Sequence, residues 1–86
     1  MKSFTYIITD PLGIHARPAG LLAKAARAFE DTTVTISRGQ ESAKAGQLMR
    51  LMSLGIRQGD EITVTAEGGS EDAVIEAMRS FFQQNL

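Results

Sequence analysis

Residues 13–19 read Gly13-Ile14-His15-Ala16-Arg17-Pro18-Ala19 and include the only histidine of this 86-residue chain. The segment stands between an alternating pattern typical of a strand and an Ala- and Leu-rich pattern typical of a helix. The first turn of a helix has unpaired backbone N–H groups and a partial positive charge, both of which stabilise an anion. A histidine placed here can attack phosphorus as a nucleophile, because the helix end and Arg17 would receive the phosphoryl oxygens.

The residues on either side of this segment predict one strand and one helix. Ser3–Thr9 alternates in polarity, and Asp10-Pro11-Leu12-Gly13 then ends the strand because proline has no N–H to donate. From Ala16 to about Glu30 the apolar residues follow the helical period, and Pro18 is tolerated because it lies in the first turn. The side chains expected in the core are Phe4, Tyr6 and Ile8 from the strand and Leu22, Ala25, Ala26 and Phe29 from the helix.

The middle of the chain predicts a hairpin followed by a short helix. Val34 and Ile36 alternate with threonine and serine, as in a half-buried strand. Arg38-Gly39-Gln40 is typical of a hairpin turn and leads into a short third strand near Glu41–Ala43. The helix that follows covers about Gln47–Gly55, with the glycine as its C-cap.

The last third of the chain predicts a strand and a C-terminal helix. Gln58-Gly59-Asp60 forms a turn, and Glu61–Ala66 alternates with Ile62, Val64 and Ala66 directed inward. After Gly68-Gly69, Ser70 is a suitable N-cap for a helix whose first turn is acidic. The expected core face of this helix consists of Val74, Ala77, Met78 and Phe81.

The resulting order of elements, β-α-β-β-α-β-α, predicts an α+β open-faced sandwich. In this architecture a four-stranded antiparallel sheet is covered on one face by three helices. No linker or internal repeat interrupts the order, so residues 1–86 are expected to form a single domain.

Composition excludes several classes of function. A net charge of −1, scattered basic residues and few aromatic residues argue against binding to nucleic acid or to an anionic membrane. The absence of cysteine excludes disulfides and thiolate chemistry, and a lone histidine with no carboxylate cluster close in sequence excludes a multi-histidine metal centre. The N-terminal residues lack the apolar core of a signal peptide, and no stretch is long enough to span a membrane. We therefore expect a cytoplasmic protein with no membrane insertion.

Two motifs resemble the histidine-containing phosphocarrier (HPr) family of the bacterial sugar phosphotransferase system. Gly13-Ile14-His15-Ala16-Arg17-Pro18-Ala19 looks like the family's active-site signature. Leu48-Met49-Arg50-Leu51-Met52-Ser53-Leu54-Gly55-Ile56 resembles the segment that precedes the family's final strand. The length and the order of elements agree as well, so the resemblance covers essentially the whole chain.

The resemblance implies a specific phosphoryl relay. His15 would accept a phosphoryl group on Nδ1 from phospho-Enzyme I and pass it to a histidine of a IIA component of a sugar permease. Arg17 would stabilise the group in transfer, and the backbone amides near Ala16 and Arg17 would receive its oxygens. Such a chain is a phosphocarrier component of a relay rather than a stand-alone enzyme, and it needs no cofactor or metal. We expect it to act as a monomer.

A second group of residues is expected to dock partner proteins. A helix as short as the second one cannot bury all five of its large apolar residues, so some of them should be exposed. Exposed methionine suits a surface that contacts several partners, and the resemblance places this surface beside His15. We expect Leu48, Met49 and Met52 in the docking surface together with Gly20, and Leu51 and Leu54 in the core.

The chain departs from the family at one regulatory position. Many Gram-positive members have a regulatory serine at the start of the second helix. An alignment on Ala43-Lys44 places Ala45 there, and an alignment on Met52-Ser53-Leu54-Gly55 places Gln47 there. Neither residue can be phosphorylated, so no serine-kinase switch is predicted.

Two other functions remain to be compared with the carrier. One is a regulatory binding module, a paralogue that docks partners without carrying phosphoryl groups; the retention of His15 with Arg17 argues against it. The other is an enzyme with its own small substrate, which is disfavoured because the chain is short and offers no second general base near the histidine.

Overall fold

The computed structural model describes all 86 residues. Its elements in chain order are β1 (Lys2–Ile7), α1 (Ala16–Arg27), β2 (Thr32–Arg38), β3 (Glu41–Lys44), α2 (Leu48–Ser53), β4 (Glu61–Gly68) and α3 (Glu71–Asn85). This is the predicted order, and the strand ends lie within two residues of the predicted ones. None of the helices is both long and apolar enough to cross a membrane.

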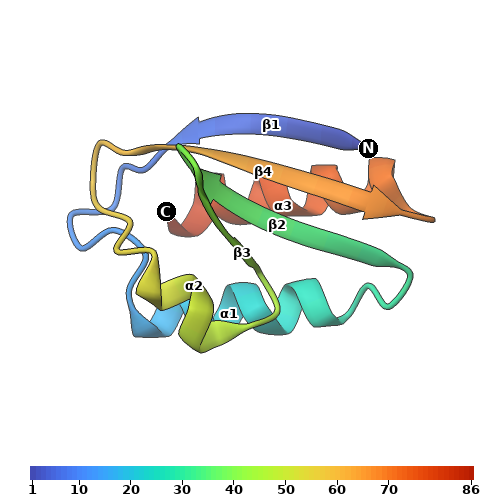
Figure 1. Cartoon of the computed structure of the whole chain (residues 1–86), viewed down its shortest axis with the longest axis horizontal. Helices are drawn as coiled ribbons and strands as arrows, with labels where there is room; N and C mark the ends of the chain where they lie inside the picture. The colour runs from blue at the N-terminus through green and yellow to red at the C-terminus, as the bar shows by residue number, and fades with distance from the viewer.

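The four strands form one antiparallel sheet in the order β1-β4-β2-β3. The register places Ile36 of β2 opposite Val64 of β4 and Ala43 of β3, and Phe4 of β1 opposite Val64 from the other side. Directly paired residues direct their side chains to the same face of a sheet, so these residues form one apolar face. All three helices lie on one side of the sheet (Figure 1), which confirms the open-faced sandwich.

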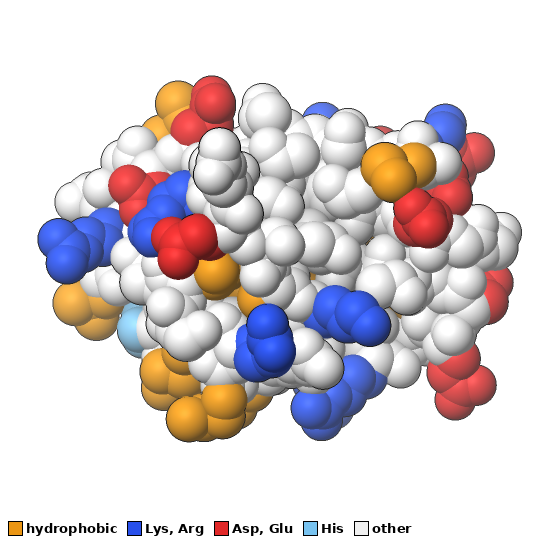
Figure 2. Space-filling view, in the orientation of Figure 1, with side chains coloured by type: hydrophobic (Ala, Val, Ile, Leu, Met, Phe, Trp, Pro, Cys, Tyr) orange, Lys and Arg blue, Asp and Glu red, His pale blue; other side chains and the backbone are white.

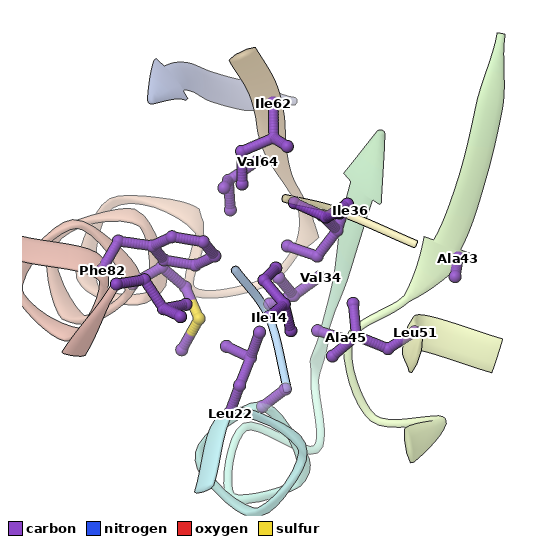
Figure 3. Packing of buried hydrophobic residues seen from close by; sticks show 14 of the residues in the cluster. Ile14, Leu22, Val34, Ile36, Ala43, Ala45, Leu51, Ile62, Val64 and Phe82 are labelled. Carbon is purple, nitrogen blue, oxygen red and sulfur yellow. The ribbon is translucent and has the colours of Figure 1, made fainter. Parts of the chain in front are cut away.

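A single hydrophobic cluster fills the space between the sheet and the helices. Figure 3 shows its centre, where Leu22 of α1 and Phe82 of α3 lie with side chains of the sheet. Phe82 is fully buried, its ring lies edge-on to the rings of Phe4 and Tyr6, and its carbonyl accepts a 3.0 Å hydrogen bond from the Tyr6 hydroxyl. These contacts fix α3 against β1.

The turn before α1 is fixed by a close approach of two backbone segments. Gly13 has φ +67°, and a Cβ atom at this position would lie 2.2 Å from the carbonyl oxygen of Ile56, so only glycine fits. The Ile14 N–H donates to the same carbonyl at 3.2 Å, and the Ile14 side chain is buried in the core (Figure 3). The start of α1 is thereby attached to the segment that follows α2.

Helix α1 ends at Arg27, about three residues before the predicted end near Glu30. The Ala28 N–H is shared between the carbonyls of Lys24 and Ala25, and the Phe29 N–H bonds to Ala26, so the final turn tightens and the helix stops. Phe29 still packs against the core, which explains why its apolar character extended the predicted helix.

Helix α3 buries a different face from the predicted one. Its buried side chains are Val74, Ile75, Met78 and Phe82. The predicted face shared Val74 and Met78 with this set but contained Ala77 and Phe81, which are only partly buried. The contacts of Phe82 with β1 determine the rotation of the helix, and such contacts between distant residues are absent from the local pattern.

Ser70 occupies the predicted N-cap position of α3, but its side chain does not cap the helix. The hydroxyl donates instead to the Asp31 carboxylate at 2.7 Å. The carboxylate of Glu71 accepts the Gly68 N–H at 2.9 Å, so side chains of the chain itself surround the start of this helix.

Candidate functional site

His15 is the residue immediately before α1, where the backbone changes from extended to helical. Its carbonyl accepts the first hydrogen bond of the helix, from the Ala19 N–H at 2.9 Å. The neighbouring Ile14 is directed into the core, and the His15 side chain is 36% exposed. The imidazole is therefore anchored through its backbone and open to an approaching protein.

The start of α1 leaves two backbone N–H groups without an acceptor. The N–H groups of Ala16 and Arg17 make no hydrogen bond within the chain, and Pro18 has no N–H. The first turn also contains no acidic residue and no side-chain cap. These are the features of a helix N-terminus that can receive an anion, next to the only histidine.

Arg17 lies beside His15 with its charge unpaired. Its side chain is exposed and makes no salt bridge, while His15, Arg17, Pro18 and Leu21 line a shallow depression of about 190 Å³. A guanidinium at the positive end of a helix is electrostatically disfavoured unless an anion is near. The depression thus combines a histidine and an unpaired cation at the start of α1, where the amides of Ala16 and Arg17 are free.

Two residues of this depression were not expected from the sequence. The carboxylate of Asp10 lies with Oδ1 3.8 Å from His15 Nε2, and Asn85 of α3 forms part of the wall. Asp10 was assigned only to the turn after β1, and no second acid–base group was expected near the histidine. Asn85 is 70 positions from His15 in sequence, and nothing local indicated that it would lie there.

Helix α2, which contacts α1, has exposed apolar side chains. Met49 is 77% and Met52 is 37% exposed, whereas Leu51 and Leu54 are buried as expected. Leu48 is only partly exposed because part of it packs against the core. Gly20 faces open space: a Cβ atom there would meet nothing within 4 Å.

Sequence reasoning missed two further exposed apolar residues, Leu12 and Leu21. Leu12 lies in the turn after β1, and Leu21 is adjacent to the buried Leu22. The local sequence pattern did not predict that either side chain would be exposed. Figure 2 shows hydrophobic side chains on both sides of the histidine. The apolar surface is therefore not confined to α2.

The charged side chains of α1 and α2 are all basic. No Asp or Glu occurs in residues 16–29 or 42–59, which contain α1 and α2. The basic residues of these two stretches are Arg17, Lys24, Arg27, Lys44, Arg50 and Arg57. Figure 2 shows Lys and Arg side chains beside the hydrophobic cluster. An apolar surface with a basic border favours a partner with an apolar and acidic surface.

The two alignments of the regulatory position are distinguished by burial. Gln47 is exposed and immediately precedes α2, whereas Ala45 is fully buried. A residue at the start of the second helix therefore corresponds to Gln47.

The family assignment rests on sequence as well as on this geometry. A family model described as "PTS HPr component phosphorylation site" matches residues 2–84. The chain belongs to the HPr family. This confirms the resemblance drawn from the two motifs, and the family is one of phosphocarrier components of the phosphotransferase system.

Two relatives match along nearly the whole chain. The phosphocarrier protein HPr of Mycoplasma genitalium is 38% identical over 85 residues, which is 99% of this chain and 97% of the relative. The multiphosphoryl transfer protein of Xanthomonas campestris is 39% identical over 79 residues, which is 92% of this chain and 9% of that protein.

Among solved structures, a mycoplasmal histidine-containing phosphocarrier protein superimposes with a TM-score of 0.92 at 36% identity, covering 96% of this chain and 93% of that one. An HPr of Thermoanaerobacter tengcongensis gives a TM-score of 0.91 at 32% identity, with 98% and 93% covered. Both superpositions support the fold, and the roles of individual site residues remain predictions.

Proposed function

We propose that this chain accepts a phosphoryl group on His15 from phospho-Enzyme I and passes it to a histidine of a IIA component. The observation that carries the proposal is the combination at the start of α1: an exposed imidazole, two N–H groups without acceptors, and an unpaired Arg17. Family membership supports the general role, and this geometry supports the proposed roles of His15 and Arg17.

In the acceptance step, a lone pair of the imidazole forms a bond to phosphorus while the bond from phosphorus to the donor breaks. The electron pair of the broken bond stays on the donor. The N–H groups of Ala16 and Arg17 receive phosphoryl oxygens, and the Arg17 guanidinium offsets their charge. His15 and Arg17 are thus the catalytic residues, and the reaction needs no cofactor or metal.

The site suits a carrier better than an enzyme with a small substrate. The depression beside His15 is shallow, so it does not enclose a metabolite or exclude water by itself. A protein partner that covers the depression would provide both functions. The group would then move when one partner leaves and another covers the same surface.

The surface around His15 is the proposed docking site for Enzyme I and IIA components. It consists of Gly20, Leu48, Met49 and Met52, to which the exposed side chain of Leu21 is added. Methionine adapts to differently shaped partners, and the basic border favours acidic ones. We propose that the chain acts there as a monomer in the cytoplasm, and that no serine kinase regulates it because Gln47 stands at the start of α2.

The first experiment is incubation with Enzyme I and phosphoenolpyruvate, followed by intact-mass analysis. We expect the mass of one phosphoryl group, labile in acid and stable in alkali, and no adduct on His15→Ala. The variant should unfold at the same temperature as the native chain, since the His15 side chain is partly exposed and makes no hydrogen bond. Addition of a IIA component should then remove the group.

The regulatory binding module predicts a different result. In that case the chain would bind Enzyme I without acquiring a phosphoryl group, although the same Enzyme I phosphorylates a known acceptor. This outcome would contradict the carrier proposal.

A further inference from the structure

Asp10 is the one acidic side chain that faces the reactive histidine. Its Oδ1 lies 3.8 Å from Nε2 of His15, and the depression that they share contains no other charged group except Arg17. No salt bridge joins Asp10 to Arg17, so the imidazole is the only basic group within ion-pair distance of this carboxylate.

The Asp10 carboxylate is held in place by its own surroundings. Its Oδ1 accepts the Leu12 N–H at 2.8 Å, and the Asp10 carbonyl accepts the Gly13 N–H at 2.9 Å. Its side chain is 26% exposed, less than that of the histidine. A carboxylate fixed in this way acts as a stationary acceptor, and the ring adjusts to it.

The contact distinguishes the two ring nitrogens. A neutral imidazole has a hydrogen on one nitrogen and a lone pair on the other, and a hydrogen bond at one nitrogen selects the tautomer. A carboxylate beside Nε2 favours the hydrogen on Nε2, which leaves the lone pair on Nδ1. The separation of 3.8 Å is longer than a hydrogen bond, and such contacts commonly shorten when a partner covers the site.

We propose that Asp10 is a positioning residue that holds His15 as the Nε2–H tautomer, so that Nδ1 is the nucleophile. The inference rests on the proposed function. As Nδ1 bonds to phosphorus, the bond from phosphorus to the donor breaks and its electron pair stays on the donor. Nε2 keeps its hydrogen, and the ring acquires positive charge opposite the Asp10 carboxylate. Asp10 thus stabilises the phosphorylated ring as well as the reactive tautomer.

Three variants test this role. Asp10→Ala removes both the acceptor and the charge, whereas Asp10→Asn keeps an oxygen for the Leu12 N–H and for Nε2 but removes the charge. Glu67→Gln is the matched control, since Glu67 is exposed and makes no salt bridge or side-chain hydrogen bond. If Asp10→Ala fails to fold because the turn is lost, Asp10→Asn still provides the test.

Two measurements are made on each variant. The nitrogen chemical shifts of the His15 ring report its tautomer at high pH without Enzyme I, and steady-state assays with Enzyme I give kcat and KM. In the native chain the ring should be almost entirely the Nε2–H tautomer. In Asp10→Ala it should relax to the mixture of a free histidine, with kcat lower by about tenfold and KM within about twofold. Asp10→Asn should keep the tautomer and lose part of kcat, and Glu67→Gln should match the native chain.

The outcomes separate this inference from the proposed function. Native tautomer and native kcat in both Asp10 variants would overturn the positioning role, even with normal phosphorylation. A native chain that Enzyme I does not phosphorylate would overturn the proposed function, and with it the catalytic part of this inference.

Discussion

The chain contains two junctions that lead from a loop into a long helix, and they treat the helix start in opposite ways. Before α3, the acidic side chains of Asp31 and Glu71 receive hydrogen bonds from Ser70 and Gly68, and the Ser70 N–H donates to the Thr32 hydroxyl at 3.0 Å. Before α1, the amides of Ala16 and Arg17 have no acceptor and the first turn has no acid. Carboxylates of the chain itself thus lie at the start of α3, whereas the start of α1 is free to bind an anion from another molecule.

This difference indicates where the structure gives up local stability for function. Acids and caps at a helix start commonly contribute several tenths of a kcal/mol or more each. Helix α1 forgoes them and places Arg17 there instead, which the helix dipole disfavours. The contrast predicts that changes at the start of α1 alter phosphoryl transfer, whereas changes at the start of α3 alter stability.

The largest expected effect in this contrast comes from Arg17. Arg17→Ala should lower kcat for phosphorylation by Enzyme I on the order of 100-fold, since it removes the only Lys or Arg side chain that lines the depression beside His15. Its free energy of unfolding should stay within about 0.5 kcal/mol of the native value, because the side chain is exposed and unpaired. Rapid-quench assays and urea unfolding measure the two quantities, and Arg79→Ala on α3 is the control for loss of an arginine. Equal kcat in native chain and Arg17→Ala would remove Arg17 from the site.

A smaller effect should follow when α1 is given an acid of the kind that α3 already has. Ala16 is exposed, and Ala16→Glu places a carboxylate in the first turn, where it competes with a phosphoryl group for the free amides. We expect kcat to fall roughly tenfold and the helix to gain about 0.5 kcal/mol from the dipole. Ala16→Gln has similar size without charge and should retain most of the activity. Equal loss of activity in both variants would indicate a steric cause and contradict the electrostatic explanation.

The smallest effect concerns acid stability at the other junction. The Ser70 hydroxyl, and after it the Thr32 hydroxyl, lower the pKa of Asp31 below its ordinary value. Because the folded-state pKa is depressed, the stabilisation is complete above the ordinary carboxyl pKa and is lost as pH falls through the folded value. Asp31→Asn should therefore lose less stability than the native chain between about pH 5 and about pH 2. Urea unfolding across this interval measures how the free energy of unfolding depends on pH. A steeper loss of stability in the variant than in the native chain would contradict the stabilising role assigned to ionised Asp31.

The sequence predicted most of the fold because its patterns are local. Alternation and helical periodicity located the seven elements. The C-cap of α2 is Leu54 rather than the predicted Gly55, which follows it with a positive φ. The face of α3 was wrong in part, because it depends on where Phe82 meets β1. Local periodicity contains no information about that meeting point.

In the candidate site, too, the sequence predicted what depends on neighbouring residues and missed what depends on distant ones. The Gly13–Ala19 motif identified His15, Arg17 and the adjacent amides, which lie together because they are neighbours in the chain. Asp10 lies near the ring across a turn in which Gly13 has positive φ, and Asn85 belongs to the end of α3. Contacts made by such turns and by distant elements require the three-dimensional structure.

Pro18 has a consequence for how tightly a phosphoryl group can be held. A phosphoryl group presents three oxygens, whereas the missing N–H of Pro18 limits the helix start to the two amides of Ala16 and Arg17. One oxygen is then free of the backbone and accessible to Arg17 or to groups of the receiving protein. A site with a complete set of amide donors would hold the phosphoryl group more tightly, whereas this incomplete one would let the proposed acceptor protein compete for it.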